Sequence, residues 1–308
     1  MNGLELSRAF YEEYGRPMLE RDFPELLPYL AVGFVGSGSE RYGFDDEISR
    51  DHDFEPGFCI FLPGEELIDR RAEFRLERAY ARLPKEYGGV KRLPISPVGG
   101  NRNGVIRTAE FYSNAVGAPD GCLSMEAWLH VPDYALAEAT NGAVYYDGYG
   151  EFSQIRESLL HMPAAARRKR LAGNLLLMAK SGQYNYVRCL QHGEPAAARL
   201  ACAEFANAAM KAAFLLRGRY LPYYKWSFRA LRALEDGEPL AERLESLLCG
   251  RQDDAQDLIE EIAAMFVTEL REHGLTRADC GDLEKHAYSV NDQIGDSTVR
   301  NMHILAAI

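Results

Sequence analysis

The sequence lacks the features of a secreted, membrane-spanning or zinc-binding protein. Its 308 residues contain no apolar run near the roughly 20 residues that a membrane span needs. The stretch from Met1 to Glu5 has neither a basic segment nor an apolar signal core, so we expect no secretion signal. The six cysteines form no Cys-x-x-Cys pair. This argues against a zinc site and predicts reduced thiols in a cytoplasmic protein.

Positive charge is also scarce. Lys and Arg number 35 against 46 Asp and Glu, which gives a formal net charge of −11. Broad contact with a nucleic-acid backbone needs a basic surface, so this balance argues against a nucleic-acid partner. It is compatible with a small cationic substrate, or with solubility alone. The chain is long enough for one large domain or two ordinary ones.

The most informative stretch is Gly36-Ser37-Gly38-Ser39. The apolar run from Leu30 to Val35 precedes it and predicts a short buried strand at about 29–35 that ends in a glycine turn. Small residues in such a turn leave backbone N–H groups and hydroxyls open to phosphate oxygens, since no large side chain blocks their approach.

A pair of carboxylates follows this turn. Asp51 and Asp53 flank His52, and an apolar run from Phe58 to Leu62 predicts a second strand at about 52–62. Alternation along a regular strand would place both carboxylates on one face. Mg²⁺ prefers oxygen ligands and commonly takes one or two protein carboxylates together with phosphate oxygens. We therefore expect Asp51 and Asp53 to bind Mg²⁺ beside a nucleoside triphosphate.

This constellation resembles the nucleotidyltransferases of the DNA-polymerase-beta-like superfamily, in which Gly-Gly or Gly-Ser after a strand precedes Asp-x-Asp or Asp-x-Glu on the next. Gly36, Ser37, Asp51 and Asp53 match that pattern, although His52 stands where the family has an apolar residue. The sequence more closely resembles a bacterial group named domain of unknown function 4037. There a nucleotidyltransferase-like domain precedes a helical domain. The later segment 220–226, Tyr-Leu-Pro-Tyr-Tyr-Lys-Trp, shares this second resemblance.

The resemblance implies a third carboxylate on a third strand. We predict that strand at Val105 to Tyr112, where Glu110 is the acid that could complete the metal site or deprotonate an acceptor hydroxyl. A solvated strand-end glutamate is the alternative. Asp133, Asp147 and Glu126 remain further candidates.

The pattern changes to successive helices after residue 150. We predict an α+β protein: a nucleotidyltransferase-type mixed sheet with flanking helices over 1–150, and a helical bundle over 151–308. The predicted helices are a lead-in at 3–29 and segments at 65–83, 122–139, 152–160, 164–181, 183–191, 195–216, 240–250, 255–273 and 291–308. The basic run 167–170 is either a solvated helix turn or a phosphate contact. Lys225 lies among aromatic residues in a predicted link between helices, and it could contact a triphosphate.

These features lead to two hypotheses of different kinds. The first is a Mg²⁺-dependent enzyme, with two metal ions, that transfers a nucleoside monophosphate from an NTP to a hydroxyl of a small molecule or protein and releases pyrophosphate. Gly36, Ser37, Gly38 and Ser39 would bind the phosphates. The second is a catalytically inactive nucleotide-binding or antitoxin-like interaction module. The acceptor, the base preference and the oligomeric state, homodimer included, stay open.

Overall fold

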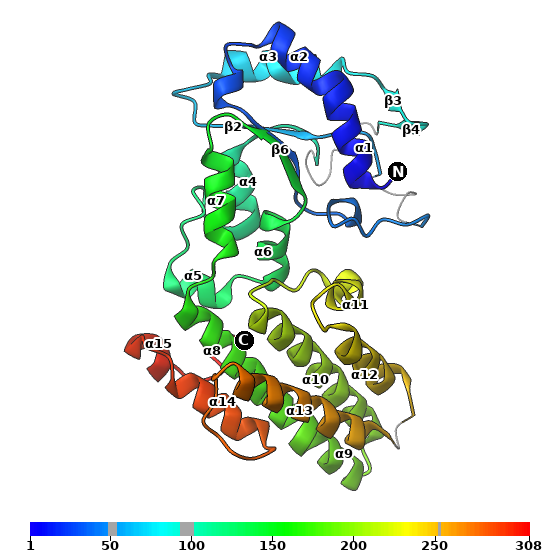
Figure 1. Cartoon of the computed structure of the whole chain (residues 1–308), viewed down its shortest axis with the longest axis vertical. Helices are drawn as coiled ribbons and strands as arrows, with labels where there is room; N and C mark the ends of the chain where they lie inside the picture. The colour runs from blue at the N-terminus through cyan, green and yellow to red at the C-terminus, as the bar shows by residue number, and fades with distance from the viewer. Residues whose placement is uncertain (49–53, 93–101, 252–253) are drawn as a thin grey trace. The chain divides into compact units, whose positions relative to one another are not determined.

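The computed structural model describes residues 1–48, 54–92, 102–251 and 254–308. It confirms an α+β fold (Figure 1). The chain forms two compact units, one of residues 1–122 and 135–160 and the other of residues 123–134 and 161–308. The predicted division at residue 150 differs from this one at two places. Helix α7 (Glu151–Leu160) belongs to the first unit, and the segment 123–134 belongs to the second.

The first unit is built on a small mixed sheet in the order β5-β2-β1-β6. Its strands are β1 (Ala31–Phe34), β2 (Cys59–Leu62), β5 (Gly104–Arg107) and β6 (Ala143–Asp147). Strand β1 pairs antiparallel with β2 and β6, whereas β2 pairs parallel with β5. A separate hairpin consists of β3 (Glu86–Tyr87) and β4 (Val90–Lys91).

Helices lie against this sheet. They and their short helical turns are α1 (Gly3–Phe10), η1 (Tyr11–Gly15), α2 (Arg16–Asp22), η2 (Leu27–Tyr29), η3 (Ser39–Arg41), α3 (Arg70–Ala81), α4 (Thr108–Val116), α6 (Asp133–Thr140) and α7. Val32 and Ile60 join one buried cluster with Phe10 and Leu19. On β2, Phe61 stacks on Phe152 of α7 at 4.0 Å between ring centroids. Helices therefore bury both faces of β1 and β2, which explains the unbroken apolar runs in these strands.

Two predicted strands differ from the observed ones. Of the strand expected at 52–62, the described part, 54–62, is a strand at Cys59–Leu62 and irregular at 54–58. The strand expected over 105–112 ends at Arg107, and α4 begins at Thr108. The buried residues Thr108, Tyr112 and Val116 recur every four positions. That is the period of a helix, and it prevails over the β-branched start of the segment.

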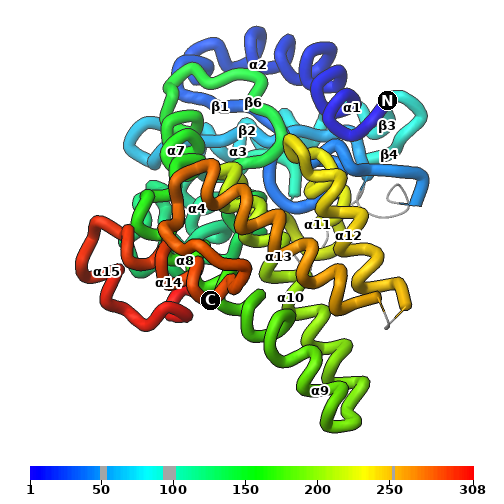
Figure 2. Tube along the Cα trace, turned by 60° about the horizontal axis from the view of Figure 1, so that its bottom comes forward, coloured from blue at the N-terminus to red at the C-terminus, as the bar shows by residue number. Residues whose placement is uncertain are grey.

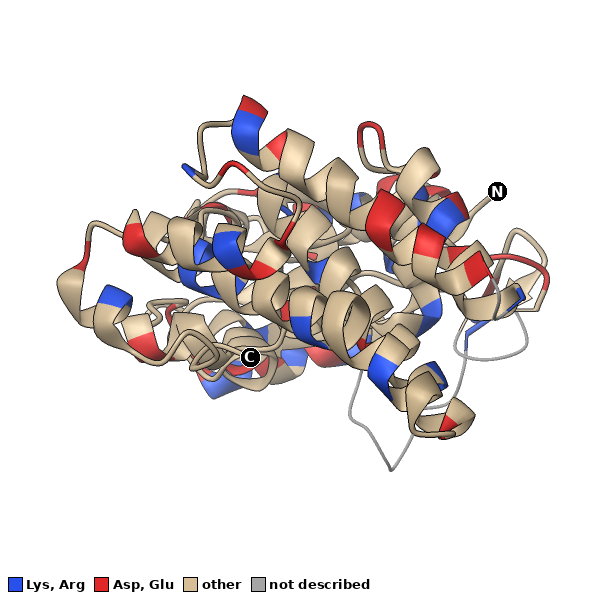
Figure 3. Cartoon of the chain, turned by 90° about the horizontal axis from the view of Figure 1, so that it is seen from below, with Lys and Arg blue, Asp and Glu red and all other residues tan. Residues whose placement is uncertain are grey.

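The second unit is a bundle of helices. They are α5 (Met125–His130), α8 (Ala164–Met178), η5 (Ala179–Tyr186), α9 (Val187–Gln191), α10 (Pro195–Leu216), α11 (Tyr224–Arg232), α12 (Glu238–Cys249), α13 (Ala255–Glu272), α14 (Leu283–Asp292) and α15 (Ser297–Asn301). Helix α10 packs along α8, and α12 packs beside α13 (Figure 2). Acidic and basic positions are interspersed along the helices in view in Figure 3. The predicted terminal helix at 291–308 is instead the short α15 followed by turns.

The basic run at the start of α8 has a structural role that differs from both interpretations of the sequence. Lys169 is fully buried, and its Nζ donates to Asn291 Oδ1 at 2.8 Å and to the Met302 carbonyl at 2.7 Å. Arg170 is buried in an ion pair with Asp133 at 2.9 Å. The neighbouring Arg168 donates to the Gln293 carbonyl. These three residues hold segments of the bundle together.

Candidate functional site

The Gly36–Ser39 turn directly follows β1, as the sequence predicts. Gly36 has φ +107° and Gly38 has φ +125°, a backbone region that side chains with a Cβ rarely adopt. A Cβ on Gly38 would also overlap the carboxylate of Glu40. The two glycines thus allow the chain to leave the sheet in a tight turn, with Ser37 exposed at its tip.

Arg41 fixes this turn from inside. Its guanidinium is buried and donates to the Val35 carbonyl at 2.7 Å and the Ser37 carbonyl at 2.9 Å. It also reaches the Arg102 carbonyl at 2.8 Å and forms a buried ion pair with Glu40. Because its donors are used within the protein, Arg41 shapes the turn rather than offering a positive charge to phosphate.

Asn141 holds the turn from the opposite side. Its Oδ1 accepts a hydrogen bond from the Gly36 N–H at 2.8 Å, and its Nδ2 donates to the Gly36 carbonyl at 2.7 Å. The expectation that the Gly36 N–H binds phosphate is therefore corrected, since that donor already has a partner. Within the described part of the chain, the N–H groups of Ser37 and Gly38 donate to no other residue. These are the backbone donors that remain for an anion.

Glu138, on the helix that leads to Asn141, is an acid that sequence reasoning missed. It is half-buried, and burial raises the pKa of its carboxyl, an effect that the nearby positive charges of Arg102 and Arg41 partly offset. In the described residues this carboxylate has no hydrogen bond or ion pair. Burial and the charge of Glu138 also raise the pKa of Tyr42, whose hydroxyl is buried without a partner there. No sequence motif pointed to Glu138, which lies in the last turn of α6, three residues before Asn141.

The predicted acids have different surroundings. Glu110 is exposed in the first turn of α4, so its expected position on a strand is wrong. Asp147 accepts from the N–H groups of Gly150 and Ser153 at 2.7 and 2.8 Å, so it has a structural role. Asp133 is engaged by Arg170, as described above. Asp51, His52 and Asp53 lie outside the described residues, and the shared strand face stays a prediction.

The donors around the turn suit a hard cation. The carboxylate of Glu138 and the hydroxyls of Tyr42 and Ser37 are oxygen groups, which Mg²⁺ prefers, and the described residues there contribute no thiolate–imidazole set for zinc. The described residues alone do not gather three His, Cys, Asp or Glu side chains into a metal site. Asp51 and Asp53 remain the predicted metal ligands.

Lys225 lies in the second unit. It is in the first turn of α11, not in a link between helices, and its side chain is exposed. Its Nζ lies 5.2 Å from the centroid of the Trp226 ring. In the described part of the chain it forms no ion pair. Its predicted contact with a triphosphate is still a prediction.

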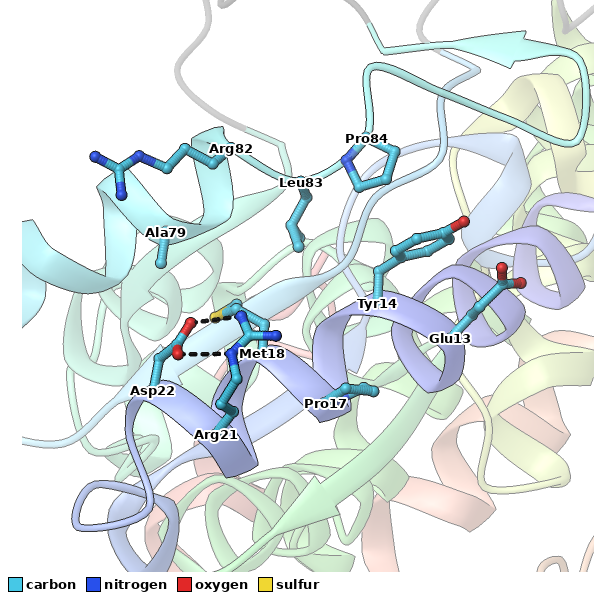
Figure 4. Close-up of a pocket in the computed structure, with 10 residues that line it drawn as sticks. All are labelled: Glu13, Tyr14, Pro17, Met18, Arg21, Asp22, Ala79, Arg82, Leu83 and Pro84. Carbon is cyan, nitrogen blue, oxygen red and sulfur yellow. Dashed lines mark hydrogen bonds and ion pairs between the residues drawn. The ribbon is translucent and has the colours of Figure 1, made fainter.

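A pocket of about 330 Å³ in the first unit contains none of these residues (Figure 4). It lies between α2 and the end of α3, with Met18 and Leu83 on its walls. Its charged residues include Arg21 and Asp22, which pair with each other at 2.7 Å. The pocket therefore offers no convergent charge of one sign to an anionic ligand.

Comparison with known proteins found one family model that matches about one third of the chain's length. Neither a curated protein nor a solved structure matches the chain. In the described residues, no helix combines the length and the apolar character required to cross a membrane. The matched family segment contains Glu138, Asn141 and Lys225, and it begins after the Gly36–Ser39 turn, Asp51 and Asp53. Across residues 128–227 the chain is similar to the family described as domain of unknown function (DUF4037).

Proposed function

We propose that this protein transfers a nucleoside monophosphate from an NTP to a hydroxyl of a small molecule or protein and releases pyrophosphate. The observation that carries the proposal is the Gly36–Ser39 turn. Asn141 and Arg41 hold it in place, while the N–H groups of Ser37 and Gly38 have no acceptor among the described residues. Such a nest of backbone donors after a strand is suited to phosphate oxygens.

Asp51 and Asp53 would hold Mg²⁺, which, when bound, neutralises charge on the phosphates. The N–H groups of Ser37 and Gly38 would bind the β- and γ-phosphates, which leave together as pyrophosphate. In the transfer, the acceptor oxygen forms a bond to the α-phosphorus, and the bond from that phosphorus to the bridging oxygen breaks. The electron pair leaves with pyrophosphate, and the acceptor proton passes to a carboxylate.

We assign the proton to Glu138 in place of Glu110. A general base works best with a pKa close to the working pH, and burial raises the pKa of Glu138 in that direction. Glu110 is an exposed residue of α4. It serves as the matched comparison, because Glu138→Gln and Glu110→Gln remove the same charge from two helices of the first unit. Greater loss of transfer in Glu110→Gln would return the role to Glu110.

The test is incubation of purified protein with each of four α-labelled NTPs, Mg²⁺ and an extract of metabolites and proteins. Label transferred to an acceptor, with equimolar pyrophosphate, is the expected result. The second candidate function is the inactive nucleotide-binding or antitoxin-like module, which His52 between the two aspartates favours. It predicts nucleotide binding without pyrophosphate.

A further inference from the structure

An exposed group of aromatic residues in the second unit has no role in the mechanism above. Tyr134, Tyr223 and Tyr224 are 46%, 48% and 75% exposed. The rings of Tyr223 and Tyr224 lie 4.3 Å apart between centroids, and Tyr134 meets Tyr223 edge-on at 6.4 Å. We call these three residues and Lys225 the tyrosine surface. Three neighbouring phenol rings in water are unusual, because tyrosine normally buries its apolar ring.

The local charge on this surface is opposite to that of the whole chain. Helix α11, which Tyr224 and Lys225 begin, contains Lys225, Arg229 and Arg232 and no acidic residue. Arg232 is paired with Glu238 and Glu245, whereas Lys225 has no carboxylate partner among the described residues. In a protein of net charge −11, a basic helix beside open aromatic rings is complementary to an anionic ligand.

The combination selects a ligand with a flat ring and negative charge. Bases stack on tyrosine rings, and this stacking needs no particular base sequence. A lysine binds phosphate as a flexible point charge. We propose that the tyrosine surface binds a nucleoside triphosphate, with the base on Tyr224 and the phosphates near Lys225. It is argued from residues of the second unit alone and does not depend on the phosphate contacts proposed for the Gly36–Ser39 turn.

The test compares binding of ATP and of inorganic tripolyphosphate by titration calorimetry in wild type, Tyr224→Ala and Tyr288→Ala. Tyr288, on α14 of the same unit, is 46% exposed and serves as the matched control. Tyr224→Ala should weaken ATP binding about fivefold to a hundredfold, the range for loss of one base–aromatic stack, and leave tripolyphosphate binding unchanged. Tyr288→Ala should bind both ligands like wild type. Lys225→Met should weaken both ligands.

Unchanged ATP affinity in a folded Tyr224→Ala protein would overturn the inference. An equal loss for ATP and tripolyphosphate would also overturn it, because base stacking would not be the cause. Tighter binding of a single-stranded oligonucleotide than of ATP, lost in Tyr224→Ala, would assign the surface to RNA instead. Tyr224-dependent ATP binding without any pyrophosphate release would leave this inference standing and remove the proposed transfer. A wild-type protein that binds no nucleotide would contradict both.

Discussion

Asn141 forms two hydrogen bonds with the backbone of Gly36, at 2.8 Å to its N–H and 2.7 Å to its carbonyl. These residues are 105 positions apart in the chain, and the contact ties the end of α6 to the turn after β1. A single side chain thereby satisfies both backbone groups of a buried glycine. The position of the remaining donors of the turn, on Ser37 and Gly38, depends on this pair.

Asn141→Ala should destabilise the protein and weaken nucleotide binding together. Removal of the amide leaves the Gly36 N–H and carbonyl buried without partners, which costs about 1–3 kcal/mol for each such group. Urea denaturation measures the loss. Asn114→Ala, an exposed position on α4, is the control and should stay near wild type. Equal stability of the two variants would show that the Asn141 contact contributes nothing.

Arg41→Lys should destabilise the protein and loosen the Gly36–Ser39 turn. A lysine ammonium cannot reproduce the planar guanidinium fork that donates to the Val35, Ser37 and Arg102 carbonyls. The buried negative charge of Glu40 is then less well neutralised. Breaking a buried ion pair typically costs about 3–5 kcal/mol, and the lysine should recover only part of this. Thermal denaturation and protease sensitivity of the turn provide the measurement. Wild-type melting and proteolysis in Arg41→Lys would contradict the anchoring role.

Gly38→Ala should be far more damaging than Gly89→Ala. Both glycines have positive φ, at +125° and +78°, but a Cβ on Gly38 meets the carboxylate of Glu40, which Arg41 holds in place. A Cβ on Gly89 meets nothing within 4 Å. Backbone strain alone costs on the order of 1–3 kcal/mol in such regions. Chemical denaturation of both variants measures the added cost at Gly38 of the clash together with its more restricted backbone conformation, and equal losses would show that neither matters.

Glu138→Gln should stabilise the protein at neutral pH while it reduces transfer. Burial raises the folded-state pKa of Glu138 above its unfolded value. The titration of this carboxyl therefore contributes to the free energy of unfolding at low pH, where proton binding favours the folded state. That contribution decreases as the pH rises from the unfolded to the folded pKa, and above both values the buried charge destabilises the fold. Glutamine removes this penalty. The gain measured by denaturation should therefore disappear at about pH 4, near the unfolded glutamate pKa. A gain that is independent of pH would contradict the assignment.

Local sequence patterns predicted much of the fold but none of the side-chain contacts that hold the Gly36–Ser39 turn in place. The strand before Gly36 and the helix from Pro195 to Leu216 follow from apolar runs and helix signals that each segment contains by itself. Glu110 was misplaced because a β-branched start hid the four-residue period of α4. Asn141 could not be predicted, because it contacts Gly36, 105 positions away in the chain. Glu138 could not be predicted either, because its carboxyl responds to burial and to the charges of Arg102 and Arg41, which the fold brings near it from other segments.

The most direct test of the proposed transfer measures pyrophosphate release from α-labelled NTP in the presence of Mg²⁺ and acceptor extract, for wild type and for Asp51→Asn/Asp53→Asn. The comparison is made at matched, verified folding, since removing the repulsion predicted between these two carboxylates should not lower the melting temperature. The account predicts pyrophosphate with stoichiometric labelled acceptor from wild type, and a loss of both by at least about a hundredfold in the variant, as for removal of groups that stabilise a transition state. Equal pyrophosphate release from the two proteins would contradict it.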